Sequence, residues 1–318
     1  MQPLSAKTIE NKILENYFEY QNLFIEFQSK FLSSLYFRYQ SIENGNLALY
    51  YAKQTHQDIL RQKDYDLNFN ISLPKFWENH RGTKLKQNSI VKIAKTIYLP
   101  KETARRKILQ LTKQKVLNKI NRDIGWLPDK QYKQNYNLFI NEEIDNVSRL
   151  ISFISKKLNY SISSQEVSKE IKEKFSFYWF HYLESQLEYL RLWSKQVHDL
   201  ELVLIFLQVA HLFTSKVKKN ISHSDLYNDP NLIKELMSAS ISATSISDVT
   251  GIPKATCVRK LEILINLKIV SQDNISRGYY LIPEAIQEKM VSRSITEKVI
   301  NIFSNFFFIC LRAIKTKI

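Results

Sequence analysis

The stretch IPKATCVRKLEILINLKIV at residues 252–270 determines how this chain is interpreted, because a similar stretch, LPKETARRKILQLTKQKVL, occurs at residues 99–117. Sliding the chain against itself until Pro100 meets Pro253 needs no gap. A constant register over roughly ninety residues predicts an internal duplication. Further pairs in this register are Ile93 with Ile246, Thr103 with Thr256, Leu111 with Leu264, Lys115 with Lys268, Gly125 with Gly278, Tyr36 with Tyr189, Arg38 with Arg191, Ser41 with Ser194, Leu47 with Leu200 and Leu49 with Leu202.

The duplication divides the chain into two halves of about 1–135 and 136–290, followed by an amphipathic C-terminal helix at 291–318. The polar stretch Gln134 to Asn146 is predicted to be the joint between the halves. A chain of 318 residues is long enough for two domains that each bury a core.

Within the first copy, apolar residues at Ala104, Ile108 and Leu111 recur at helical spacing and predict a helix that opens at Pro100. A shorter helix is expected just upstream, around Ile90 to Ile97. The second copy repeats the pattern and has Gly251 at the turn between the two helices. Behind each second helix, an apolar pair, a polar stretch and a glycine followed by aromatic residues predict a β-hairpin.

This order of helix, turn, helix and hairpin resembles the winged helix-turn-helix of bacterial transcriptional regulators, particularly MarR-like and IclR-like proteins. The second copy carries the family phrase at Ile252, Pro253, Thr256, Arg259, Leu261, Leu264 and Ile269-Val270. The resemblance implies a mainly α fold with two tandem winged helix-turn-helix units at about 85–130 and 240–285. Small β-hairpins form the wings, and long amphipathic helices precede each unit. The sequence departs from the family at Tyr98, Lys115 and Lys268, where glycine is usual.

The resemblance also implies a function, namely sequence-specific binding of double-stranded DNA by a transcriptional regulator. Recognition helices at about 100–114 and 253–267 would enter the major groove. Lys101 and Arg105 are expected to contact bases, whereas Arg106 and Lys107 are expected to lie nearer phosphate. The full set of predicted DNA-binding residues is Lys101, Glu102, Thr103, Arg105, Arg106, Lys107, Lys119, Arg122, Lys254, Thr256, Arg259, Lys260 and Arg277.

Net charge supports an anionic partner, because the chain carries +15 and has a pI near 9.5. Much of the excess lies in the first copy, where fourteen Lys and Arg face three Asp and Glu between Arg81 and Lys130. From Ser240 to Ala285 the balance is near zero. Phosphate neutralisation supplies the sequence-independent part of DNA affinity, so the first copy is expected to be the stronger contact.

Outside the copies, aromatic-rich segments at 17–39 and 175–193 have helical spacing and predict long packing helices. The following segments, 47–60 and 200–213, are expected to support the two motifs. Besides DNA, the partner considered is a second copy of the chain, bound through the aromatic helices or the C-terminal helix. No stable membrane insertion is expected, and the absence of a secretory signal pattern predicts a cytoplasmic location.

Enzymatic function is not expected from this sequence. Cys257 and Cys310 match no metal-ligand spacing, and the six histidines form no ligand pattern either. Phosphate-binding and dinucleotide-binding glycine motifs are absent from a chain with five glycines. We therefore expect no catalytic residues, no metal and no cofactor.

Two alternatives remain open at this point. One is a plasmid replication initiator, a class that is also basic and also built from two winged helices, which would bind iterated origin repeats. The other is a protein-interaction scaffold, favoured by the near-neutral charge of the second copy, since winged helices also dock proteins.

Overall fold

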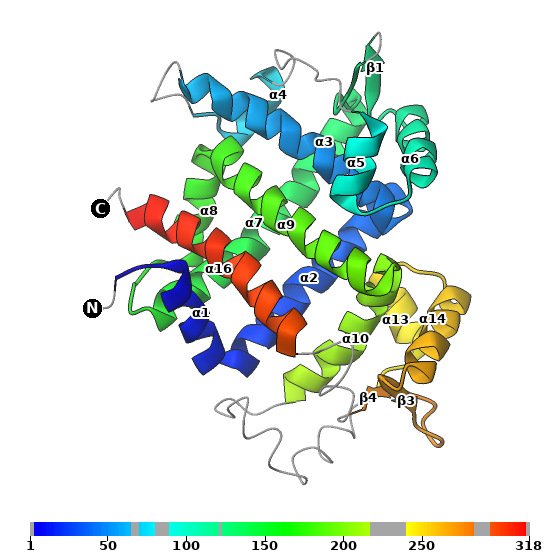
Figure 1. The fold of residues 1–318 in the computed structure, drawn as a ribbon. Helices are drawn as coiled ribbons and strands as arrows, with labels where there is room; N and C mark the ends of the chain where they lie inside the picture. The colour runs from blue at the N-terminus through cyan, green and yellow to red at the C-terminus, as the bar shows by residue number, and fades with distance from the viewer. Residues whose placement is uncertain are drawn as a thin grey trace. The chain divides into compact units, whose positions relative to one another are not determined.

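A computed structural model describes most of the chain, which is mainly helical with two small antiparallel hairpins, as the sequence predicts (Figure 1). The described residues are 3–64, 70–79, 89–120, 123–216, 240–282 and 293–315. Two compact units form, and each combines segments that are distant in sequence. The first contains Met1–Arg38 and Gln196–Ser304, and the second contains Tyr39–Lys195 and Asn305–Ile318. These units differ from the two sequence halves, 1–135 and 136–290, which describe the predicted duplication and stay a prediction.

The first unit is built from helices and one hairpin. Its elements are α1 (Ala6–Glu15), α2 (Tyr17–Tyr39), α10 (Leu200–Lys216), α13 (Ala243–Thr250), α14 (Lys254–Asn266), β3 (Val270–Gln272), β4 (Tyr279–Leu281) and the first part of α16 (Arg293–Lys315). Helices α2 and α16 share its core, where Phe24 and Phe303 meet edge to face with ring centroids 4.8 Å apart. A buried hydrogen bond of 2.6 Å from the Gln208 amide to the Ser29 hydroxyl joins α10 to α2.

The second unit contains the other hairpin and most of the aromatic core. Its elements are α3 (Ile42–Leu60), a 3-10 turn η1 (Arg61–Asp64), α4 (Leu73–Asn79), α5 (Ile90–Ile97), α6 (Lys101–Lys113), β1 (Asn118–Ile120), β2 (Asp123–Gly125), α7 (Lys130–Lys157), α8 (Ser164–Glu173), nearly all of α9 (Phe175–Val197) and the end of α16. The fully buried His56 ring stacks on Phe76 at 4.7 Å, and Phe76 meets Phe175 at 5.3 Å. This cluster ties α3, α4 and α9 together.

The predicted joint at Gln134 to Asn146 was wrong, because these residues lie inside the long helix α7. Tyr136, Ile140 and Ile144 are buried at four-residue intervals along it. That spacing places them on one face of the helix, so the polar residues between them occupy the solvent side. The polar composition of residues 134–146 therefore reflects the solvent-facing side of an amphipathic helix and not a linker.

The bounds of the helices recur along the chain in two different registers. Helices α5 and α13 correspond at both ends in the register that aligns Pro100 with Pro253, and so do α6 and α14. The preceding helices start in a different register, which aligns Ile42 with Leu200. In that second register α1 matches α8, α2 matches α9, and α3 matches α10. The pairings predicted for these helices in the first register were therefore wrong, namely Tyr36 with Tyr189, Arg38 with Arg191, Ser41 with Ser194, Leu47 with Leu200 and Leu49 with Leu202.

Backbone conformation confirms the two registers independently of the helix ends. Gln40 and His198, which correspond in the second register, both adopt a left-handed conformation, with φ of 57° and 55°. Tyr98 and Gly251, which correspond in the first register, do the same with φ of 57° and 74°. Since residues other than glycine seldom adopt positive φ, these coincidences identify equivalent positions.

The C-terminal helix packs inside the protein. Ile300, Phe303, Phe307, Cys310 and Leu311 of α16 are all fully buried. Among the described residues, Ser294–Lys315 is the one helix that is long and apolar enough to cross a membrane, and half of its apolar window is buried in the chain. A second segment of that kind arises only if α9 and α10, which meet at a bend of 99°, are taken as one span.

Candidate nucleic-acid interface

The turn between α5 and α6, the two helices of the first motif, forms without a glycine. Helix α5 ends at Tyr98, which takes the left-handed conformation, and the Leu99 N–H donates to the Ala94 carbonyl at 2.9 Å. Pro100 then caps α6, and its carbonyl accepts the Ala104 N–H at 2.9 Å. Proline suits this place because an N–H here would have had no intrahelical partner.

The buried stripe of α6 fixes the orientation of the helix. Ala104, Ile108 and Leu111 are each at most 2% exposed, and both α5 and α6 pack on α3 (Figure 1). A helix anchored through residues at i, i+4 and i+7 must present its remaining faces to solvent. The packing therefore determines which side chains face outward.

Three basic residues of the prediction lie on the outward side of α6. Lys101, Arg105 and Arg106 are exposed, and so is the acidic Glu102. Arg105 Nε donates to Glu102 Oε2 at 2.7 Å, and this hydrogen bond, with the charge of Arg105, lowers the pKa of Glu102. Arg105 keeps its terminal nitrogens for another acceptor, while Lys101 and Arg106 make no salt bridge with any described residue.

The first motif is strongly basic as a whole. Helices α5 and α6 carry seven Lys and Arg and one acidic residue, Glu102. Sequence reasoning did not single out Lys92 and Lys95 of α5, although both are exposed. The sequence does contain a signal for them. Lys92 and Lys95 are three residues apart and lie between the apolar residues Ile93, Ala94 and Ile97, a pattern that places both lysines on the solvent side of a helix.

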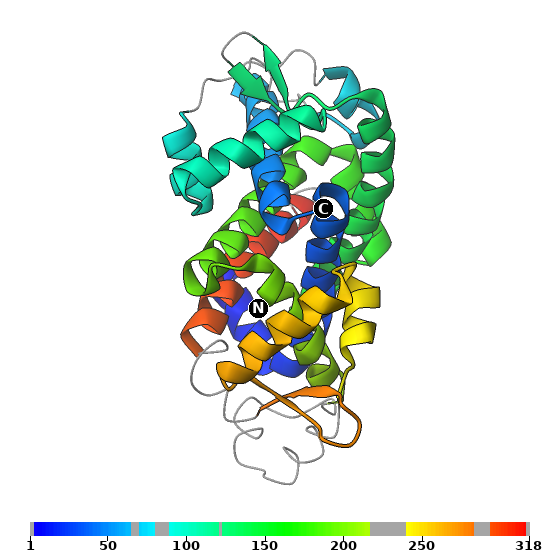
Figure 2. The same ribbon diagram turned by 90° about the vertical axis from the view of Figure 1, so that its right-hand side faces the viewer.

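The second motif has the same backbone and a different surface. Gly251 ends α13 with a left-handed conformation, and Pro253 caps α14. The two helices, drawn in yellow and gold in Figure 2, pack against each other. Lys254 and Arg259 are exposed, but Ala255 stands where the first copy has Glu102. Helices α13 and α14 carry three basic residues and two acidic ones. The outer face of α14 is therefore close to neutral.

A short bridge ties the second hairpin to the segment before α13. The Ile241 N–H donates to the Tyr279 carbonyl at 2.9 Å, and the Tyr279 N–H donates back to the Ile241 carbonyl at 2.8 Å. Gly278 permits this approach, because a Cβ added there would lie 2.6 Å from the Cβ of Ser240. Both hairpins are antiparallel, and in the second one Val270 pairs with Leu281.

Two lysines of the predicted set face the protein interior. Lys107 Nζ lies 3.7 Å from Glu43 Oε2, and Lys260 Nζ lies 2.6 Å from Asp199 Oδ2. The Lys260 side chain is 9% exposed. A cation engaged in this way is not available to a phosphate, so we remove both lysines from the candidate interface.

The remaining predicted residues are distributed over the two motifs. Thr103 and Thr256 are half-buried on the first turns of α6 and α14. Lys119 is exposed on β1, and Arg277 is exposed at the tip of the second hairpin, where its φ is 56°. Arg122 lies outside the described residues.

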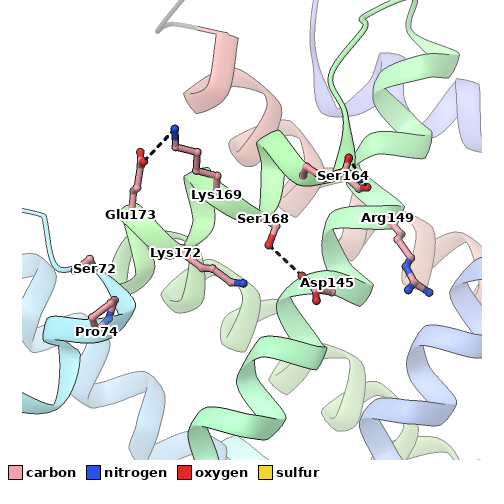
Figure 3. A pocket seen from close by; sticks show the side chains of 10 residues that line it. Ser72, Pro74, Asp145, Arg149, Ser164, Ser168, Lys169, Lys172 and Glu173 are labelled. Carbon is pink, nitrogen blue, oxygen red and sulfur yellow. Dashed lines mark hydrogen bonds and ion pairs between the residues drawn. The ribbon is translucent and has the colours of Figure 1, made fainter.

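A surface groove of about 710 Å³ lies between α7 and α8 (Figure 3). None of the residues that line it belongs to the predicted DNA-binding set. Along this groove Lys169 pairs with Glu173 at 3.9 Å, and the Ser168 hydroxyl donates to Asp145 at 3.0 Å. No cluster of His, Cys, Asp and Glu able to hold a metal occurs in the described part of the chain.

Comparison of the chain with known protein families, with curated proteins and with solved structures found no match.

Proposed function

We propose that this protein is a sequence-specific, double-stranded DNA-binding regulator of transcription, with two winged helix-turn-helix units and α6 as the principal reading helix. The observation that carries the proposal is the outward face of α6. Its Lys101, Arg105 and Arg106 are exposed together on a helix whose opposite face is anchored to α3.

The chemistry of these side chains suits DNA. An arginine can donate two parallel hydrogen bonds to guanine O6 and N7, and lysine can reach the same atoms. Arg106, Lys92 and Lys95 add positive charge for phosphates, whose neutralisation releases counterions. The exposed Lys119 on β1 extends this basic surface to the hairpin, as a wing would.

The second motif has a smaller part in this proposal. Its Lys254 and Arg259 supply cations to a phosphate backbone, while Ala255 and the half-buried Val258 offer few hydrogen bonds to base edges. The near-neutral charge of α13 and α14 favours the scaffold alternative for this motif, in which it docks a protein. Exposed apolar side chains occur in both motifs, with Val249 at 59% in the second and Val91 at 58% in the first, and do not separate them.

The test is selection of DNA fragments by the full-length protein, followed by affinity measurements over a salt series. The selected sequence is compared in wild type and in the variant Lys101→Ala/Arg105→Ala/Arg106→Ala. We expect the variant to lose about 30-fold or more in affinity for that sequence, since each good base contact contributes tenfold or more. The slope of log K against log salt should become shallower by roughly one unit per lost phosphate contact.

A charge-matched control separates the site from net charge. Lys156→Ala/Lys169→Ala/Lys172→Ala removes three cations from α7 and α8 and should bind the selected sequence nearly as wild type does. Equal losses in both variants would show that the charge acts nonspecifically. Recovery of iterated origin-type repeats in the selection would favour the replication initiator.

A further inference from the structure

Lys260 contacts the first turn of the helix that supports its motif. Its Nζ donates to Asp199 Oδ2 at 2.6 Å and lies 3.2 Å from Glu201 Oε2. Asp199 precedes α10 and accepts the Leu202 N–H at 3.1 Å, so it acts as a capping residue of that helix. The ammonium therefore joins α14 to the N-terminus of α10.

Lys107 makes the corresponding contact in the other unit. Its Nζ donates to Ser41 Oγ at 3.0 Å and lies 3.7 Å from Glu43 Oε2. Ser41 is the N-cap of α3, and its hydroxyl accepts the Asn44 N–H at 3.4 Å. The ammonium thus joins α6 to the N-terminus of α3.

The two contacts are equivalent even though the residues around them have diverged. Each lysine is the seventh residue of its helix, and each reaches the cap and the second residue of the supporting helix. The cap is serine in one unit and aspartate in the other. The preceding residue, Gln40 or His198, is left-handed in both, so the local backbone is the same.

Each lysine contact stabilises a helix N-terminus and orients two helices. Acidic groups at a helix N-terminus are stabilised by the helix dipole, and a partly buried cation satisfies them further. Burial lowers the pKa of Lys260, but its hydrogen bond with Asp199 and the nearby carboxylates raise the pKa more, and the net direction is upward. Apolar stripes such as Ala104, Ile108 and Leu111 are nondirectional, whereas an ion pair fixes one register of one helix on another.

We propose that Lys107 and Lys260 are positioning residues, which set the register and angle of the second helix of each motif on its supporting helix. Lys107 thereby aims Lys101 and Arg105 without touching DNA itself. This last consequence rests on the proposed function, whereas the mechanical role does not.

The DNA arm of the test uses two adjacent residues with opposite roles. Lys107→Met should lower affinity for the selected sequence about tenfold while nonspecific affinity and the salt slope stay near wild type, because no phosphate contact is lost. Arg106→Met, its exposed neighbour, should lower affinity for all DNA and reduce the salt slope by about one unit. Lys107→Arg should restore selectivity, and a reduced slope in Lys107→Met would overturn the positioning role.

The second arm measures folding and needs no DNA. Thermal unfolding is recorded for Lys260→Met, for Glu201→Gln and for the double variant. We expect each single change to lower Tm by several degrees and the double change to lower it by clearly less than the sum, which indicates direct coupling. If Lys260→Met unfolds the protein, Lys107→Met with Glu43→Gln supplies the same cycle at the more exposed pair.

The outcomes separate the two proposals. Additive shifts in Tm would show that the lysines do not hold the helices and would overturn the positioning role. Coupled shifts together with no DNA selection by wild type would retain the positioning role and remove the proposed DNA-binding function.

Discussion

Lys115 and Lys268 each follow the C-cap residue of the second helix of their motif and adopt a left-handed backbone conformation, with φ of 57° and 56°. The conformation lets the chain reverse: the Val116 N–H donates to the Leu111 carbonyl at 3.0 Å, and the Ile269 N–H donates to the Leu264 carbonyl at 2.9 Å. Glycine is the residue that adopts it at no steric cost. The chain keeps the turn geometry although it lacks glycine at both places.

Replacing Lys115 by glycine is expected to stabilise the protein by about 1 kcal/mol, because the strain of a Cβ in the left-handed region disappears. Urea unfolding of Lys115→Gly measures the change. Gln110→Gly is the matched control, since Gln110 is exposed inside α6 and should lose about 1 kcal/mol. A loss of stability in both variants would show that the position tolerates lysine without strain.

At the scale of single elements, the helices of the two motifs were predictable. Pro100 and the stripe of Ala104, Ile108 and Leu111 define the start and the buried face of α6, and the same pattern defines α14. The interior contacts of Lys107 and Lys260 were not predictable. Both have ordinary surface spacing in the sequence, and the partner of each lies more than sixty residues away.

The register of the supporting helices could not be obtained from sequence for a different reason. Nearly every residue of α10 from Leu200 to Ala210 is buried, so its apolar pattern has no polar face that would fix a rotation. Leucines therefore matched in the wrong register. The cap residues Ser41 and Asp199, which define the correct register, are chemically different.

Helix α16 allows a sharp test with neighbouring phenylalanines. Phe307 is fully buried, whereas Phe308 is half-exposed and lies beside Arg312. Phe307→Ala should cost about 3 to 5 kcal/mol of folding free energy because it leaves a cavity in the core. Phe308→Ala should cost under about 1.5 kcal/mol, since little burial is lost. Chemical denaturation in detergent-free buffer measures both.

The reverse order would indicate another environment for α16. If Phe308→Ala were the more damaging change, or if either variant dissociated an oligomer before unfolding, the helix would be held by a partner or a membrane. Chromatography with light scattering at the same protein concentrations distinguishes these cases, and it also tests whether the chain forms the homodimer considered from its sequence.

At the scale of the whole molecule, the chain order conceals how the protein is assembled. The first unit takes its supporting helix and motif from one region of the chain and α1 and α2 from another, and α16 contributes to both units. Local sequence patterns predict helices and hairpins well, but they do not indicate which distant segments pack in the same core. That information lies in packing such as the contact of Phe24 with Phe303.

Each unit also contains a partly buried histidine, and we expect these two residues to make folding sensitive to acid. Burial lowers the pKa of His181 and of His211, and the nearby Glu184 and Glu26 offset this only in part. A histidine whose folded pKa lies below its ordinary value of 6.5 binds its proton more readily in the unfolded chain. Stability should therefore fall as the pH is lowered through 6.5 toward the depressed values.

Urea midpoints between pH 7.5 and 5.5 measure this dependence in wild type and in His181→Gln/His211→Gln. The double variant should show a flatter profile across that window, because glutamine keeps a similar volume and does not titrate. His198→Gln, the same change at an exposed position, is the control for the substitution itself. Identical profiles for the double variant and wild type would assign the acid sensitivity to carboxyl groups, which titrate at lower pH. In that case neither His181 nor His211 would contribute to the loss of stability at low pH.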